Sequence, residues 1–174
     1  MNPTCSSVFS SSTRVAVICA GWHADIVGQA RQSLGAEFER LGLPPDQVDH
    51  FDVPGALEIP LLAQRIARMG RHAAIVACGL VVDGGIYRHD FVAHAVIDGL
   101  MRVQLDSGVP VLSCVLTPQA FHEHAEHLDF FSRHFVTKGQ EVARACAQVL
   151  VAAQRVDTVV AKLVVQSPVF QMTP

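Results

Sequence analysis

The chain has 174 residues, of which half are apolar and 17% are charged, and its formal net charge at pH 7 is −3. This length fits one domain, and the absence of a basic run argues against a nucleic-acid partner. No stretch reaches the ~18 uninterrupted apolar residues of a membrane span, which argues against a membrane protein. The apolar excess over an average domain favours a buried subunit interface, and hence a homo-oligomer.

The first half of the chain alternates between strand and helix patterns. Residues 15–20 are a continuous apolar run and predict the first strand, and residues 24–41 carry apolar side chains at helical spacing. Residues 47–53 predict a second, partly polar strand nearer an edge of the sheet. Residues 57–69 again have helical spacing, with Pro60 tolerable only in the first turn.

The second half continues the alternation. Residues 73–82 and 109–116 are near-continuous apolar runs, as expected for parallel strands that are covered on both faces. Helical spacing recurs over residues 91–105 and 139–156. The repeated β-α order predicts one α/β domain of three layers, α/β/α, with a four-stranded parallel sheet and right-handed crossovers, which is a flavodoxin-like architecture.

The two ends lie outside this alternation. Residues 1–13 are Ser-rich and predict a flexible lead without a signal peptide, residues 14–156 form the predicted domain, and residues 157–174 predict an apolar but irregular tail. Five dispersed cysteines without a Cys-x-x-Cys pair indicate reduced thiols in the core, which favours a cytoplasmic protein.

Ligands of open parallel sheets bind beyond the carboxyl ends of the strands, so the loops that follow the strands carry the candidate site. Trp22, the only tryptophan, follows the first strand, where its ring either stacks on a planar heterocycle or plugs the end of the sheet. Pro54 and Gly55 follow the second strand and predict a tight turn. Glu58 then either accepts hydrogen bonds from ligand hydroxyl groups or complements the helix dipole.

The loop after the third strand contains Gly84 and Gly85, followed by Arg88 and His89. Paired glycines ahead of a helix leave backbone amides open to an anion. Arg88 adds a permanent cation, and His89 adds a group that titrates near neutrality. The pattern favours a phosphate site with an acid–base residue beside it over a plain turn.

A His-rich segment follows the fourth strand, with histidines at positions 122, 124, 127 and 134. Their spacing does not form a paired-ligand motif such as H-E-x-x-H, so we predict a polar surface or an interface there and no metal site. Arg133, His134 and Lys138 are the better candidates for contacts to a phosphate.

Residues 53–60, Val-Pro-Gly-Ala-Leu-Glu-Ile-Pro, resemble the VPGAxEIP signature of the 6,7-dimethyl-8-ribityllumazine synthases. Lys138-Gly139-Gln140-Glu141 is similar to the KGxE motif of the same family, and the resemblance covers about residues 14–156. Trp22 stands where the family usually has Phe. Together with an altered third loop, it resembles the divergent second type, whose members form decamers from two pentamers.

The third loop departs from the family pattern Arg-Gly-x-Thr-x-His-x-Asp. An ungapped match puts Asp83 on the Arg and Arg88 on the proton-transferring His, with His89 one position late. Chemistry favours His89 for proton transfer, because an Arg side chain stays charged, whereas the alignment favours Arg88. The phosphate-binding Arg of the family's last loop falls on Phe130.

The resemblance implies a transferase of riboflavin biosynthesis that needs no cofactor and no metal. It would condense 5-amino-6-(D-ribitylamino)uracil with 3,4-dihydroxy-2-butanone 4-phosphate to give 6,7-dimethyl-8-ribityllumazine, phosphate and water. The alternative is a flavin- or lumazine-binding assembly protein without catalysis. The implied uracil and ribityl contacts are Trp22, Ala56, Leu57, Glu58, Leu80, Val81, Val82 and the neighbouring subunit's Ser113, and the implied phosphate contacts are Gly84, Gly85, Arg133, His134 and Lys138.

Overall fold

Four parallel strands in the order β2-β1-β3-β4 form the centre of the computed structural model, which describes residues 9–83, 88–119, 121 and 124–166. This order, with β1 and β3 inside, is that of a flavodoxin-like sheet and confirms the predicted architecture. The partly polar second strand lies at an edge, as predicted. The strands are β1 (Val15–Ala20), β2 (Val48–Val53), β3 (Ala74–Leu80) and β4 (Val111–Leu116).

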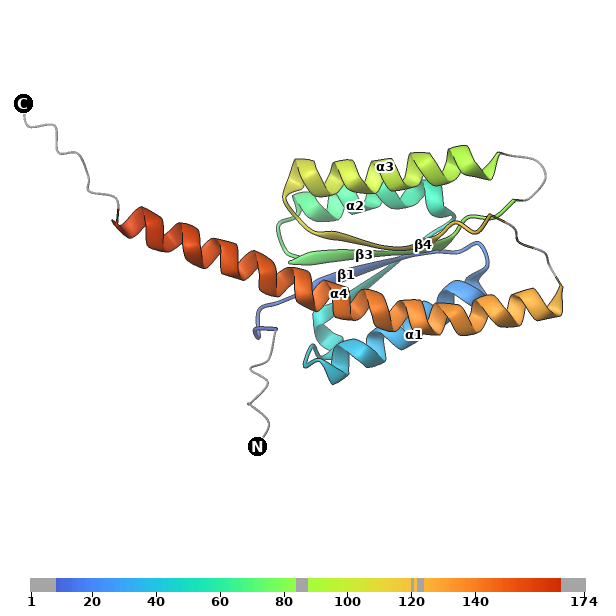
Figure 1. Ribbon diagram of the computed structural model, residues 1–174, viewed down its shortest axis with the longest axis horizontal. Coiled ribbons are helices and arrows are strands. Elements are labelled where there is room, and N and C mark those ends of the chain that lie inside the picture. The colour runs from blue at the N-terminus through green and yellow to red at the C-terminus, as the bar shows by residue number, and fades with distance from the viewer. Residues whose placement is uncertain (1–8, 84–87, 120, 122–123, 167–174) are drawn as a thin grey trace, which may run out of the picture.

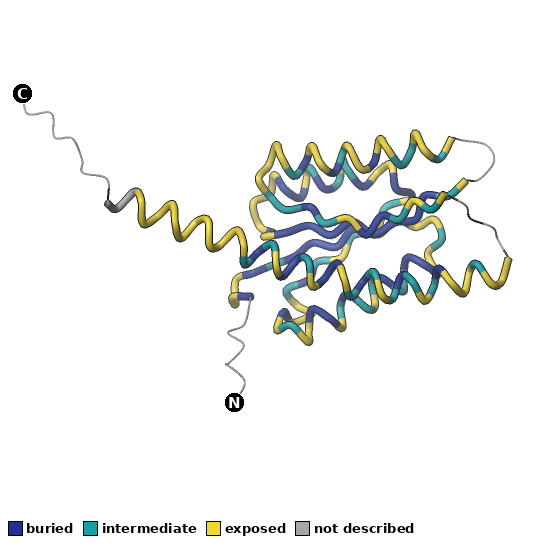
Figure 2. The backbone as a smooth tube through the Cα atoms, viewed as in Figure 1, coloured by how far each residue is buried: buried dark blue, intermediate teal, exposed yellow. Residues whose placement is uncertain are grey.

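The helices cover both faces of the sheet (Figure 1). Every residue of β1 and β3 is buried between the two helical layers, which explains why their sequences are continuous apolar runs (Figure 2). One face carries α1 (Ala24–Arg40) and α4 (Ala125–Gln166), and the other carries α2 (Ile59–Arg68) and α3 (His89–Ser107).

Three buried cysteines lie side by side across the centre of the sheet. Cys19 of β1 is in register with Cys78 of β3, and Cys78 is in register with Cys114 of β4. All three are free thiols. Hydrogen bonds with the thiols of Cys114 and Cys19, together with burial, raise the pKa of Cys78 well above its ordinary value. The prediction of reduced core thiols therefore holds at these positions.

The last helix is much longer than predicted. It begins at Ala125 and ends at Gln166, so it includes the polar segment before residue 139 and part of the tail that we predicted to be irregular. Phe131 and Phe135, four residues apart, are buried in the core and anchor the first turns of the helix. Gly139 does not start the helix: it lies inside it and is buried at the contact with α1.

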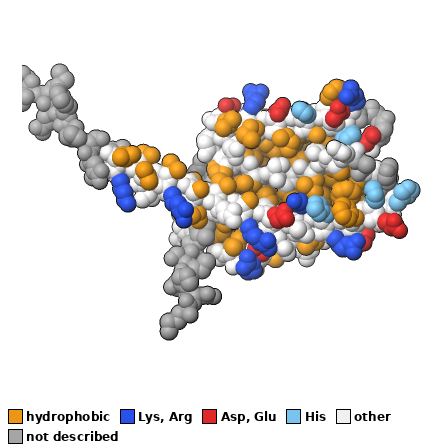
Figure 3. Space-filling view, viewed as in Figure 1, with side chains coloured by type: hydrophobic (Ala, Val, Ile, Leu, Met, Phe, Trp, Pro, Cys, Tyr) orange, Lys and Arg blue, Asp and Glu red, His pale blue; other side chains and the backbone are white. Residues whose placement is uncertain are grey.

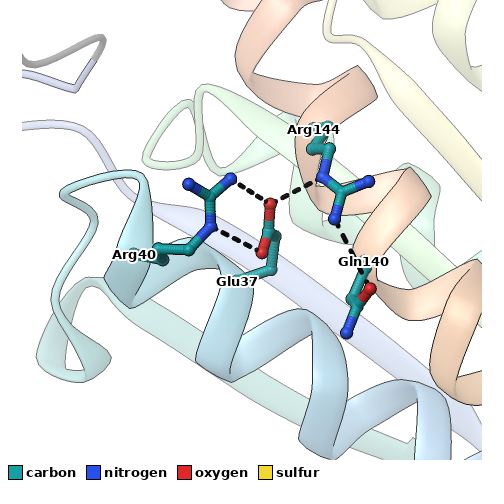
Figure 4. A network of polar contacts seen from close by, with 4 residues as sticks. All are labelled: Glu37, Arg40, Gln140 and Arg144. Carbon is teal, nitrogen blue, oxygen red and sulfur yellow. Dashed lines mark hydrogen bonds and ion pairs between the residues drawn. The ribbon is translucent and has the colours of Figure 1, made fainter. Parts of the chain in front are cut away.

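A polar network joins α1 to α4 at the edge of this contact (Figure 4). The buried Glu37 accepts hydrogen bonds from Arg40, with Nη2 at 2.6 Å and Nε at 2.9 Å, and from Nε of Arg144 at 2.7 Å. Arg144 also donates to Gln140 at 3.4 Å. The hydrogen bonds from Arg40 and then Arg144 lower the pKa of Glu37 to about 2. The network therefore requires an ionised carboxylate.

Replacing Glu37 by Gln should lower the free energy of unfolding at pH 7 by about 2 kcal/mol, because charge-assisted hydrogen bonds are lost. A carboxyl whose pKa falls from 4.5 to about 2 on folding stabilises the protein above its ordinary pKa, and this contribution disappears as the pH falls towards 2. The variant should therefore lose less stability than the parent between pH 7 and pH 3. Urea titrations at both pH values measure this difference. The exposed Glu39→Gln on the same helix is the control, and equal pH dependence of Glu37→Gln and parent would contradict the assignment.

Candidate functional site

A pocket of about 500 Å³ lies at the carboxyl ends of β1, β2 and β3. Its walls come from the three loops that follow these strands and from the first turn of α3. This volume lies within the range of ligand-binding pockets. The residues that line it are Trp22, His23, Pro54, Gly55, Ala56, Leu57, Glu58, Leu80, Val81, Val82, His89 and Val92.

Trp22 presents its ring at this pocket and is 66% exposed. The indole packs over the turn after β2, since a Cβ added at Gly55 would lie 3.6 Å from its Cδ2 and Cε2 atoms. A backbone hydrogen bond of 2.8 Å from the Gly21 N–H to the Val53 carbonyl fastens the two loops together. The ring is thus supported from below and accessible for stacking, and it does not plug the end of the sheet.

His23 is the one described non-glycine residue with a positive φ, at 54°. This left-handed conformation is uncommon for a residue with a side chain and tends to occur at functional sites. Here it lets the chain turn from β1 directly into α1, while the imidazole contacts the ring of Phe121 at 5.2 Å between centroids. The strained residue therefore fixes the loop that carries Trp22.

Glu58 holds the turn at the bottom of the pocket. Its Oε2 accepts a hydrogen bond of 2.9 Å from the N–H of Gly55, so the side chain caps the short 3-10 helix Ala56–Glu58. The residue is nonetheless exposed and lines the pocket. The sequence left dipole complementation and ligand binding as alternatives, and the observed capping role leaves the exposed side chain able to bind a ligand as well.

His89 and Arg88 differ sharply in their surroundings. His89 is the first residue of α3 and lines the pocket together with Val92, three residues later on the same helical face. Arg88 precedes the helix, is exposed and does not line the pocket. Its guanidinium bonds to Asp90 at 2.9 Å and lies 4.2 Å from the centre of the Phe91 ring. This hydrogen bond lowers the pKa of Asp90.

The remaining predicted residues that the structure describes do not line this pocket. Ser113 is exposed on β4, where its Oγ accepts a hydrogen bond of 3.2 Å from the Val115 N–H. Gly84 and Gly85 lie outside the described residues. The three predicted cations lie on α4 and not in a loop: Arg133 pairs with Asp129 at 2.8 Å, Lys138 pairs with Glu141 at 2.7 Å, and His134 stacks on Phe130 with 5.7 Å between ring centroids.

Four residues that line the pocket were not among the predicted contact residues: His23, Pro54, Gly55 and Val92. His23 is a direct neighbour of Trp22, and Pro54 and Gly55 form the turn that the sequence predicted before Ala56. Val92 belongs to the apolar stripe of α3 and gave no sign of a second role. Within the described residues, no group of three or more His, Cys, Asp and Glu side chains forms a metal-binding arrangement, and His122 lies outside those residues. No helix in the same part of the chain is long and apolar enough to cross a membrane.

Comparisons with known proteins agree with the sequence motifs. The family described as 6,7-dimethyl-8-ribityllumazine synthase matches residues 12–154. A 6,7-dimethyl-8-ribityllumazine synthase of Rhodococcus erythropolis is 67% identical over 132 residues, which are 76% of this chain and 85% of that protein. Two proteins named 6,7-dimethyl-8-ribityllumazine synthase 2 are also similar. The one from Bradyrhizobium diazoefficiens is 56% identical over 84% of this chain and 88% of its own, and the one from Pseudomonas syringae pv. tomato is 51% identical over 86% and 90%.

Proposed function

The chain belongs to the 6,7-dimethyl-8-ribityllumazine synthase family, and from this membership we propose that it catalyses formation of 6,7-dimethyl-8-ribityllumazine. Its substrates would be 5-amino-6-(D-ribitylamino)uracil and 3,4-dihydroxy-2-butanone 4-phosphate. The observation that carries the proposal is that an exposed indole, Trp22, and an imidazole, His89, line one pocket at the carboxyl edge of the sheet. The indole can stack on a flat heterocycle, and the imidazole can transfer protons.

Substrate binding follows from the chemistry of the lining. The uracil would stack on Trp22 and meet the backbone of Leu80 to Val82 with its edge, while the ribityl hydroxyl groups would reach the exposed carboxylate of Glu58. The phosphate of the second substrate would lie near the start of α3, where the helix dipole favours an anion. Gly84 and Gly85 precede this helix in the sequence.

The reaction would then proceed by condensation. The amine on the uracil ring attacks the ketone, and loss of water gives an imine. Loss of a proton and of phosphate gives an enol, which tautomerises to a methyl ketone. The ribityl-bearing amine then attacks this carbonyl, and loss of a second water closes the second ring. His89 would move the protons in these steps. Holding two reactants in the correct orientation supplies much of the acceleration, up to about 7–11 kcal/mol in favourable cases.

We further propose that the working unit is a homo-oligomer with the site between subunits. Large apolar side chains are exposed on the 3-10 helix Ala56–Glu58, on α2 and on α3, as expected for a surface that another subunit covers. Figure 3 shows hydrophobic side chains on the side of the molecule that α3 occupies. Ser113, Arg133, His134 and Lys138 do not line the pocket of their own chain, which is consistent with a role in a neighbouring site. The exposed residues are Leu57, Leu61, Phe91, Ile97, Met101 and Leu105.

Mixing the purified chain with both substrates tests catalysis directly. Formation of a fluorescent lumazine together with released phosphate would support the enzyme. Binding of a lumazine or flavin without product would instead support a non-catalytic binding protein. The departure of the third loop, which carries Asp83 where most family members carry Arg, is the observation that favours this second candidate.

Replacing Trp22 by Ala should raise the Kd for the ribitylaminouracil by about 5- to 150-fold, because stacking contributes about 1–3 kcal/mol. Trp22→Phe should retain most of the affinity, since a smaller aromatic face remains. Isothermal titration of both variants measures the difference. An unchanged Kd for Trp22→Ala would mean that the heterocycle binds elsewhere.

A further inference from the structure

The C-terminal part of α4 projects beyond the sheet, and no described element packs beside it there (Figures 1 and 2). The buried face of α4 ends at Leu150, and from residue 152 to residue 163 every position is exposed. A few turns of helix alone in water are only marginally stable. The family match ends at residue 154, so most of this projecting segment lies outside it.

The projecting segment nevertheless carries an ordered apolar stripe, which we call the C-terminal seam: Val149, Ala152, Val156, Val159 and Leu163. The spacing between its members is alternately three and four residues, which is the pattern of a helix that pairs with other helices. Val156, Val159 and Leu163 are each more than half exposed. Figure 3 shows hydrophobic side chains along the projecting part of α4.

The C-terminal seam is not an extension of the face that packs on the domain. That face comprises six buried residues: Gly139, Val142, Ala143, Cys146, Ala147 and Leu150. At 100° per residue, the seam lies about 130° around the helix from it. Beyond Leu150, the same side of the helix carries Gln154 and Asp157, which are polar. The seam therefore faces away from the side of the helix that packs on its own domain.

The charges beside the seam indicate which partner fits it. Arg155 and Lys162 each precede a seam residue and so lie on the same flank, whereas Ala153 and Val160 lie on the other flank. Two antiparallel copies would bring the cationic flanks together. Two parallel copies would place each cationic flank opposite the uncharged one, which avoids this repulsion. The segment is thus compatible with itself in parallel orientation.

We propose that the C-terminal seam pairs in parallel with the same segment of another copy of this chain. The inference does not depend on catalysis. Because parallel pairing brings like residues together, Val159→Cys should form an intermolecular disulfide on mild oxidation. Gln154→Cys, which points to the opposite side of the same helix, is the matched control. The unmodified chain gives the background from its five native cysteines.

We expect several-fold more disulfide-linked dimer from Val159→Cys than from Gln154→Cys or the unmodified chain, on non-reducing gels. Equal yields from the two variants would overturn the proposal. Hydrogen exchange tests the same contact without cysteines. Amides of residues 152–163 should lose protection in the double variant Val156→Glu/Leu163→Glu and keep it in Gln154→Glu/Ala161→Glu, which adds the same charge on the other side.

The C-terminal seam could also be covered by the last residues of its own chain. A variant that ends at Gln166 distinguishes this possibility from pairing with a second copy. It keeps every described residue, and its amides over residues 152–163 should remain protected. Loss of protection on this truncation would make the last eight residues the cover and overturn self-pairing. Protection that survives the Val156→Glu/Leu163→Glu change would also overturn it.

Discussion

Gly139→Ala should destabilise the fold by about 3 kcal/mol, the largest loss that we expect from a single methyl group in this chain. A Cβ at Gly139 would lie 2.4 Å from the carbonyl oxygen of Ala30 and 2.1 Å from Oγ of Ser33. The Ser33 side chain can rotate away, but the backbone of α1 cannot. The two helices would have to separate, which would disturb the packing of Phe135 and the other residues between them.

Gly35→Ala is the matched control for this substitution. Gly35 lies in α1, and a Cβ there would have no neighbour within 4 Å. Since Ala favours the helix over Gly, this variant should be more stable than the parent by about 0.5–1 kcal/mol. Thermal and urea unfolding of both variants measure the two opposite shifts. A Gly139→Ala variant as stable as Gly35→Ala would show that the helices do not approach as closely as described.

His89→Ala should lower kcat for lumazine formation by about 10²-fold, because an acid–base group typically contributes at least this much. The expectation rests on the proposed function and on the position of His89 in the pocket. Arg88→Ala should have a smaller effect, since the Arg88 side chain is exposed and bonded to Asp90. Steady-state kinetics with both substrates separate a change in kcat from a change in KM.

His94→Ala is the control, because His94 is an exposed histidine on the same helix and does not line the pocket. It should leave kcat unchanged. If Arg88→Ala caused the large loss and His89→Ala did not, the ungapped alignment with the family would identify the catalytic residue correctly. The position of His89 in the pocket would then not indicate a role in proton transfer. If neither variant changed kcat, proton transfer would belong to another group.

The sheet was predictable because its inner strands are covered on both faces, which makes their sequences nearly uniform in polarity. The helix over residues 24–41 was equally clear, since its buried side chains recur at one spacing and one face. The last helix was not. Gly139 suggested a boundary, yet the tertiary contact with α1 requires a glycine inside the helix. The low helix propensity of glycine favours a helix end at this position, but the close packing of the two helices requires glycine inside the helix. Packing outweighs propensity here.

The position of the pocket was predictable from a general rule of parallel sheets, and Trp22, Glu58 and His89 all lie in it. The choice between Arg88 and His89 as the residue that faces the pocket was not predictable, because it depends on the residue at which α3 begins. The predicted helix began at residue 91, whereas the observed one begins at His89. Contributions from another subunit do not follow from one chain's sequence pattern at all.

The row of thiols across the sheet can report how often the core of the domain opens. Cys78 lies at the middle of the row, is completely enclosed, and is flanked by a sulfur on each neighbouring strand. A thiol reagent can reach it only when β3 separates from its surroundings. Its labelling rate with a chromogenic disulfide therefore measures how often the centre of the domain opens, without any introduced probe.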